Sequence, residues 1–236
     1  MLKFQNDNAK LNKSIYNVCS FRLPAGYACP AAVDCLAKAN RYTGRITDGE
    51  NAHIRCFAAT DEARSPQARD ARWFNFDALR GLGRREMAHL IHTSLPIRQG
   101  TIRIHVSGDF YNQSYFDAWV IVATLNPDIH FYAYTKAINF WMACKAEIPV
   151  NLNLTASRGG THDWLIAMNQ LKEAIVVFHP DEAERMGLAI DHDDSLAMHG
   201  TSSFALLLHG TQPAKSKASV ALSAMRKEGV QFSYAK

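Results

Sequence analysis

Six short runs of apolar or β-branched residues recur along the chain, and most are followed by a stretch with helical spacing. We expect strands at residues 15–21, 101–106, 130–134, 150–155, 174–178 and 204–208. Several runs are almost continuously apolar, which is typical of parallel strands covered on both faces. The alternation predicts an α/β fold of the (βα)6 type, either a partial TIM-like barrel or an open, mostly parallel sheet.

Helical spacing fills the intervals, and we expect helices within residues 61–95, 114–125, 137–144, 163–171, 181–186 and 214–227. With 236 residues, 47% of them hydrophobic, the chain can bury one large core. It contains no internal repeat, low-complexity tract or Gly/Ser linker. We therefore expect a single α/β domain over residues 1–236, with a cysteine-bearing loop segment at residues 24–60.

The chain has no apolar run of the about 18 residues that a membrane span needs, and its first residues lack a signal-peptide core. We expect no membrane partner and a cytoplasmic location (the host cytoplasm if a phage encodes it). An odd number of cysteines, five, favours thiols used in reduced form. Cys19 lies within the first strand pattern, and Cys144 lies on a helical face. We expect both to be ordinary buried side chains.

Polar residues cluster just after the carboxyl ends of the predicted strands. They are Ser107–Gly108–Asp109, Thr135–Lys136, Ser157–Arg158–Gly159–Gly160, His179 and His209–Gly210–Thr211–Gln212. Ligands bind at that edge in parallel α/β folds, because the loops after the strands converge there. The cysteine segment leaves the first strand at the same edge, so its thiols and these polar groups should face one cavity.

Cys29, Cys35 and Cys56 gather in the Gly/Pro-rich segment after the first strand. They can be small buried apolar side chains, ligands of a structural zinc with His53 as the fourth, or ligands of an iron–sulfur cluster that leaves one iron open. The C-x5-C spacing is longer than that of usual zinc knuckles. We favour the cluster and keep zinc as the alternative.

Several separated motifs carry a family resemblance: CPAAVDC, RCFAA, IHVSGDF, FYAYTK, LTASRGG, AIDHDDS and LHGTQPA. Together they resemble the phage-associated gene-product-88-like family, over about Leu23 to Lys227. This resemblance implies no particular activity.

The architecture also resembles that of radical S-adenosylmethionine enzymes, which carry three cysteine ligands after the first strand. The resemblance implies that Cys29, Cys35 and Cys56 hold a [4Fe-4S] cluster. Its open iron would chelate the amino and carboxylate groups of S-adenosylmethionine, which the cluster then cleaves reductively. The spacing here is C-x5-C-x20-C rather than the usual C-x3-C-x2-C, so the resemblance is one of arrangement.

Ser107, Gly108 and Asp109 follow the second main strand, where those enzymes carry a Gly-Gly-Glu-like motif that touches the cofactor's amino group. The resemblance implies that these residues bind the cofactor, with Asp109 receiving the ammonium, and that Ser157 and Arg158 hold its carboxylate and ribose. Asp109 is explained equally well as a capping or turn residue of the following helix.

His209 and Thr211 follow the last predicted strand, just before Pro213, which suits the first turn of a helix. Backbone N–H groups at a helix start favour an anion. We assign Thr211 to cofactor binding, and His209, together with Asp109, to catalysis. A simple capping loop is the alternative.

Two further regions have both a functional and a plain interpretation. Asp191–Asp194 carries the hard ligands of a metal or phosphate-ester site, or forms a solvated capping loop. The arginines from Arg64 to Arg85 alternate with Trp73, Phe74 and Phe76. They predict either a nucleic-acid surface with stacking aromatics, or arginines in solvent with the aromatics in the core.

These observations predict an iron–sulfur protein, a radical S-adenosylmethionine-like enzyme acting on a small-molecule or nucleotide substrate. The alternative is a non-enzymatic or nucleic-acid-binding phage accessory protein with a structural zinc or cluster.

Overall fold

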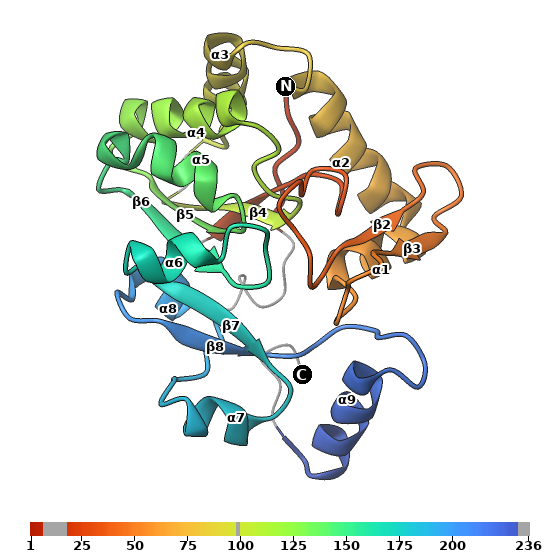
Figure 1. The fold of residues 1–236 in the computed structure, drawn as a ribbon. Coiled ribbons are helices and arrows are strands. Elements are labelled where there is room, and N and C mark those ends of the chain that lie inside the picture. Colours follow the sequence, from red (N-terminus) through yellow and green to blue (C-terminus); the bar gives the residue numbers. More distant parts are fainter. Residues whose placement is uncertain (7–17, 98–99, 231–236) are drawn as a thin grey trace.

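The structure, a computed structural model, describes residues 1–6, 18–97 and 100–230. Within these residues the main sheet has six strands in the order β1-β4-β5-β6-β7-β8, and every neighbouring pair is parallel. The strands are β1 (Val18–Arg22), β4 (Thr101–Ser107), β5 (His130–Thr135), β6 (Leu152–Ser157), β7 (Glu173–Val177) and β8 (Phe204–Leu207). The predicted parallel α/β fold is confirmed (Figure 1).

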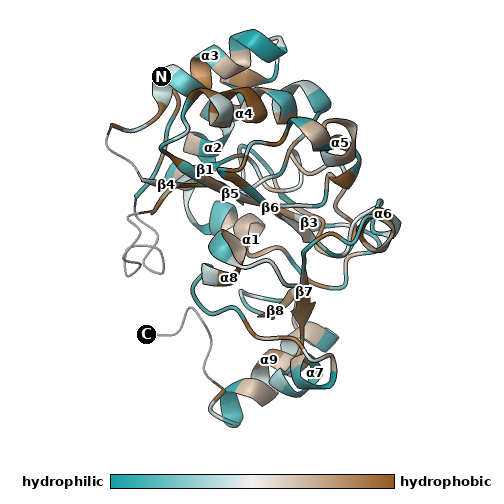
Figure 2. Cartoon of the chain, turned by 90° about the vertical axis from the view of Figure 1, so that its left-hand side faces the viewer, coloured by the Kyte–Doolittle hydropathy of each residue, from teal (hydrophilic) through white to brown (hydrophobic). Residues whose placement is uncertain are grey.

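The helices cover both faces of this sheet. They are α1 (Phe57–Arg64), α2 (Pro66–Leu79), α3 (Arg84–Ser94), α4 (Gln113–Leu125), α5 (Ile138–Ala143), α6 (Trp164–Met168), α7 (Pro180–Arg185), α8 (Ser195–His199) and α9 (Lys217–Lys227). Figure 2 shows α3 and α4 on one side of the strands β1 to β6, and α1 and α8 on the other. None of the helices in the described part of the chain is long and apolar enough to cross a membrane.

The largest core lies between β1, β4, β5 and the helix α4. Trp119 of α4 is fully buried, with its ring centroid 5.5 Å from that of Phe21 and 6.2 Å from that of Phe131. The helix begins at Asn112, whose side chain accepts a hydrogen bond from the backbone N–H of Tyr115 at 2.8 Å. Burial of these aromatic rings holds α4 against the sheet.

The sheet has two irregular places. Strands β6 and β7 pair at only two positions, so the edge formed by β7 and β8 turns away from the plane of the other strands (Figure 1). The register between β1 and β4 shifts beyond Arg103, where His105 takes a φ of +65°. Such a bulge bends the strand.

Predicted and observed elements differ in a few places. The first strand was expected at 15–21; the structure shows Val18–Arg22, and residues 15–17 lie outside the described residues. The cysteine segment, expected as a loop, also contains the antiparallel hairpin of β2 (Ala37–Ala39) and β3 (Ile46–Asp48). Strands of three residues are too short to show a recognisable alternation.

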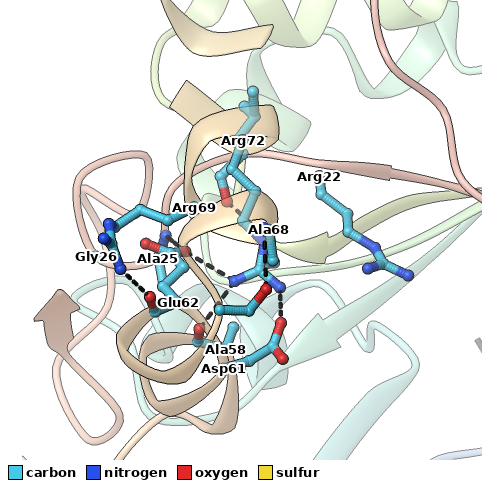
Figure 3. Close-up of polar contacts among 12 residues, drawn as sticks. Arg22, Ala25, Gly26, Ala58, Asp61, Glu62, Ala68, Arg69 and Arg72 are labelled. Atoms are coloured by element: carbon cyan, nitrogen blue, oxygen red, sulfur yellow. Dashed lines mark hydrogen bonds and ion pairs between the residues drawn. The ribbon is translucent and has the colours of Figure 1, made fainter. Parts of the chain in front are cut away.

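A buried ionic cluster joins α1, α2 and the start of the cysteine segment (Figure 3). The Arg72 guanidinium donates to Glu62 Oε1 at 2.9 Å and to the Ala58 carbonyl at 2.9 Å, and it pairs with Asp61. Glu62 Oε1 also accepts from the Ala25 backbone N–H at 2.8 Å. Burial raises the pKa of Glu62, while the charge of Arg72 opposes this rise.

We predict that Arg72→Met lowers the free energy of unfolding by about 3–5 kcal/mol, because Glu62 is then buried without its countercharge. Chemical denaturation measures the loss. The matched control is Arg80→Gln, since Arg80 lies at the end of the same helix, is exposed, and pairs with the partly exposed Asp77. The control should cost about 1 kcal/mol or less, and equal losses for both variants would contradict the prediction.

Candidate functional site

A cavity of about 290 Å³ opens at the carboxyl edge of the main sheet, on the side of α1. Its lining includes all three thiols that the sequence singled out, Cys29, Cys35 and Cys56. It also includes most of the other predicted site residues, namely Ser107, Gly108, Asp109, Ser157, Arg158 and His209. The expectation that thiols and polar loop residues face one cavity agrees with this arrangement for these residues, whereas Thr135, His179 and Gln212 do not line the cavity.

Thr211 is the exception among the predicted site residues. It does not line the cavity, and its hydroxyl accepts a hydrogen bond from Arg64 Nη2 at 2.9 Å on the exposed surface. The structure therefore places Thr211 beside the end of α1 rather than with the thiols.

Backbone hydrogen bonds hold the Cys29–Cys35 stretch against the ends of two strands. The Asp109 N–H, after β4, donates to the Ala28 carbonyl at 3.0 Å. The Gly159 carbonyl, after β6, accepts from the N–H groups of Val33 at 3.1 Å and Asp34 at 3.0 Å. The two cysteines are thus positioned by the sheet, although the apolar side chains that their own segment buries are small alanines.

Two glycines permit this close approach. Gly108 has a φ of +81°, and a Cβ there would lie 2.6 Å from the Leu23 side chain. Gly159 has a φ of +98°, and a Cβ there would lie 2.7 Å from the Asp34 carboxylate. Only glycine adopts such angles readily without a side-chain clash, so contact with the cysteine segment explains both residues.

Cys56 is the N-cap residue of α1, and a different contact holds it. The side chain of Gln212, in the loop after β8, accepts from the Arg55 N–H at 2.7 Å and donates to the Arg55 carbonyl at 3.1 Å. Gln212 is buried. Sequence reasoning assigned it no role, because an amide in a polar loop gives no sign of which backbone it will meet.

The three thiols are near enough to influence one another. Burial raises the pKa of Cys29 well above its usual value, and the negative charges of Asp109, Cys56 and Cys35 raise it further. The Gly26 N–H lies 3.3 Å from Cys29 Sγ and opposes the rise. Burial and these neighbours therefore favour the neutral form of the Cys29 thiol.

Cys56 and Cys35 have similar surroundings. Burial raises the pKa of Cys56 to about 12, although N–H groups in the first turn of α1, those of Ala58 and Ala59, favour the thiolate. Burial also raises the pKa of Cys35, and the nearby Lys136 ammonium opposes this effect. Each sulfur thus has a local group that stabilises negative charge.

Asp109 is enclosed by hydrogen-bond donors. Its Oδ1 accepts from the Thr135 hydroxyl at 2.6 Å and the Phe110 N–H at 2.7 Å, and its Oδ2 from the Lys136 N–H at 2.8 Å. Burial raises the pKa of Asp109 to about 6, against the effect of these donors. The carboxylate therefore joins the ends of β4 and β5, and its catalytic role stays a prediction.

Lys136 is a buried cation of the cavity to which the sequence assigned no role. Its ammonium donates to the carbonyl of Ser157 at 3.1 Å, to the hydroxyl of Ser157 at 3.0 Å and to the Arg158 carbonyl. The Arg158 guanidinium pairs with Glu173 at 2.7 Å. Ser157 and Arg158 consequently have protein partners already, which a cofactor would have to share.

His209 lies at the β8 side of the cavity. Its Nδ1 is 3.1 Å from the Leu207 carbonyl, and its ring centroid is 5.1 Å from that of Phe57. The contact with Phe57 brings it beside the start of α1 and therefore beside Cys56.

The structure also bears on the zinc alternative. His53 is exposed, and its Nε2 lies 3.9 Å from Asp34 Oδ1. Within residues 1–6, 18–97 and 100–230, no group of three or more His, Cys, Asp or Glu side chains is placed to hold a metal ion, and this includes Cys29, Cys35 and Cys56 as the structure places them. The acidic run at Asp191–Asp194 is no exception, since Asp191 and Asp194 are buried and accept hydrogen bonds from the protein.

The arginine-rich region is not a uniform basic face. Arg69 and Arg72 are buried in the ionic cluster of α1 and α2, so the expectation that the arginines face solvent is wrong for these two. Trp73 is buried, whereas Phe74 is 45% exposed. Arg64 lies on the surface. Any nucleic-acid surface here would be smaller than the sequence predicted.

The fold and the cavity define a class of protein: a parallel α/β protein with three thiols at the carboxyl edge of its sheet. The family model described as Gene product 88 matches residues 1–226, and the chain belongs to this family. This confirms the resemblance carried by the sequence motifs. A comparison with curated proteins gave no match, and neither did one with solved structures. The description of the family specifies no activity.

We predict that Gln212→Ala loosens the segment before Cys56, because the half-buried backbone groups of Arg55 lose their partner. The free energy of unfolding should fall by about 1–3 kcal/mol, and the Arg55 amide should exchange its hydrogen faster. Hydrogen exchange with mass spectrometry measures the second effect. Thr211→Ala, one residue away on the surface, is the control and should change neither quantity; unchanged exchange at Arg55 in Gln212→Ala would contradict the assignment.

Proposed function

We propose that this protein binds an iron–sulfur cluster through Cys29, Cys35 and Cys56, and that it acts as a radical S-adenosylmethionine-like enzyme on a small molecule in the adjoining cavity. The observation that carries the proposal is the placement of three mutually interacting thiols on the wall of one cavity. Three thiols are the protein ligand set of a four-iron cluster that keeps one iron open.

The chemistry of these donors fits such a cluster. Three thiolates so near one another repel in a buried site, and the positive charge of iron would offset that repulsion. Backbone N–H groups near the sulfurs, such as that of Gly26, are the donors that stabilise cluster ligands. In a cluster each thiolate ligates a different iron, so three sulfurs do not have to converge on one ion.

The surrounding residues would orient and insulate the cluster. Asp109 holds the end of β4 to that of β5 and, through its N–H, to the residue before Cys29. Lys136 supplies a buried positive charge beside Cys35. When bound, the cluster would supply one-electron reduction of the sulfonium of S-adenosylmethionine, and the residues above would shield that chemistry from water.

A second candidate, a non-enzymatic accessory protein with a cluster for shape alone, has one observation in its favour. Asp109, Ser157 and Arg158, the residues implied to hold the cofactor, all have partners within the protein. These internal contacts are enough to explain Asp109, Ser157 and Arg158 in a protein that never binds S-adenosylmethionine.

We predict that Cys56→Ser loses the cluster without losing the fold. Serine is a strong N-cap residue, so the metal-free variant should be as stable as the metal-free wild type or more stable by about 0.5–1 kcal/mol. Iron and sulfide per chain after anaerobic reconstitution, together with thermal unfolding, measure both effects. Cys144→Ser is the control, because Cys144 lies outside the cavity lining and should leave the iron content unchanged; zinc without sulfide in the wild type would overturn the cluster.

We predict that reconstituted wild-type protein cleaves S-adenosylmethionine to methionine and 5′-deoxyadenosine when dithionite supplies the electron and a C–H or S–H group of the buffer or protein supplies the hydrogen atom. The protein should absorb broadly near about 400 nm before the reaction, and Cys56→Ser should give no product. Chromatography of the quenched reaction measures 5′-deoxyadenosine. Protein that carries the cluster and gives none of this product would reject the enzyme and leave the accessory role.

A further inference from the structure

Arg103 occupies an unusual place for an arginine, the middle of a buried parallel strand. It lies in β4 between Ser20 of β1 and Tyr132 of β5, and the residue is only 8% exposed. Burying a guanidinium there is costly unless its charge is compensated. Arg103 also lines the cavity, so its guanidinium could contact a bound molecule.

The compensating charge comes from Asp194. Its Oδ2 accepts from Arg103 Nη1 at 2.6 Å and from the Tyr132 hydroxyl at 3.0 Å, and its Oδ1 lies 3.4 Å from the Tyr134 hydroxyl. The Arg103 guanidinium also lies over the ring of Tyr134, 5.1 Å from its centroid. Arg103, Tyr134 and Asp194 all line the cavity, and we call these three residues the cavity floor.

The backbone at Asp194 is left-handed. Its φ is +67°, a conformation uncommon outside glycine that aspartate enters more readily than most residues. Asp194 is the N-cap residue of α8, yet its side chain makes no capping bond. Neighbouring carboxylates bond the first turn instead: Asp193 accepts from the Ser195 N–H at 3.0 Å, and Asp191 from the Ala197 N–H at 3.2 Å. The Asp194 carboxylate is thus directed to the sheet.

Along β4, Arg103 lies well before the carboxyl end of the strand, the edge that the cysteine segment contacts. Arg103 precedes Ser107, the last residue of β4, by four residues, which is roughly 10–13 Å of strand. The side chains of Val106, Ile175 and Leu206 contribute apolar wall to the same cavity. A molecule that fills the cavity would therefore contact apolar side chains as well as the cavity floor and the thiols.

We propose that the cavity floor recognises an uncharged amide group, the chemistry shared by carboxamides and nucleobase edges. Arg103 donates to the carbonyl oxygen, and Asp194 accepts from the amide N–H beside it. A carboxylate can accept from Arg103 but has no N–H for Asp194, and an amidinium can donate to Asp194 but has no acceptor for Arg103. Only the uncharged amide satisfies both groups, so the pair selects against both charged forms. An uncharged amide is therefore the substrate class that we propose for this cavity. The inference rests on the proposed function in one respect only, namely that this cavity is the substrate site.

Matched probes test the proposal on the full chain without metal. Benzamide, benzoate and benzamidine share one ring and differ in charge, and uracil represents a nucleobase edge. We expect benzamide or uracil to bind about ten-fold more tightly than either charged probe by ligand-observed NMR, the selectivity of about one well-placed interaction. The tighter of the two identifies the source of the amide. Failure of both to bind, or tighter binding of a charged probe, overturns the proposal.

Variants locate the binding. Asp194→Asn keeps the shape and removes the negative charge, so benzoate should gain about ten-fold relative to benzamide. Leu206→Phe fills the cavity and should abolish amide binding. If Asp194→Asn fails to fold, Leu206→Phe alone decides whether the amide binds in this cavity. Cys144→Ser, at a residue outside the cavity lining, should bind the amide as the wild type does. Because these measurements use protein without metal, a failure of the cluster proposal does not affect them and is recognised separately. Amide binding that persists in Leu206→Phe places the probe elsewhere and overturns the assignment.

Discussion

The arrangement of the site depends on one constraint: a segment poor in large apolar side chains must be held against the edge of a sheet. Hydrogen bonds meet this need. The Asp109 N–H, the Gly159 carbonyl and the Gln212 amide each bond the cysteine segment at a different point. Since buried backbone groups are costly when left without partners, these contacts determine the path of the segment. The three thiols reach one cavity wall as a consequence.

The ionic cluster of Glu62 and Arg72 also helps to position the cysteine segment, through the helix α1. It ties α1 to α2 and to the Ala25 N–H, and so sets the position of the helix whose first turn faces Cys56. Breaking a buried pair leaves an uncompensated charge, so the helix start has little freedom to move. Two independent sets of contacts therefore fix where the thiol of Cys56 lies.

The sequence predicted the parts of this structure that follow from periodicity and from the geometry of parallel sheets. The main strands were found because apolar runs repeat, and the shared cavity of Cys29, Asp109 and His209 was expected because loops after parallel strands converge. The partner of a buried polar group was not predictable in this way. Gln212 meets Arg55 across 157 positions of sequence, and no local pattern encodes such a contact.

The two ends of the cavity require different partners, and this asymmetry constrains what it can hold. At the edge, Cys29 and its neighbouring thiols need positive charge to become ligands, since burial keeps them protonated. At the floor, Arg103 and Asp194 already compensate each other and offer a donor beside an acceptor. The proposed cluster would bring positive charge to the first end, and the proposed amide would meet a donor and an acceptor at the second. A single small ion would meet only the first condition.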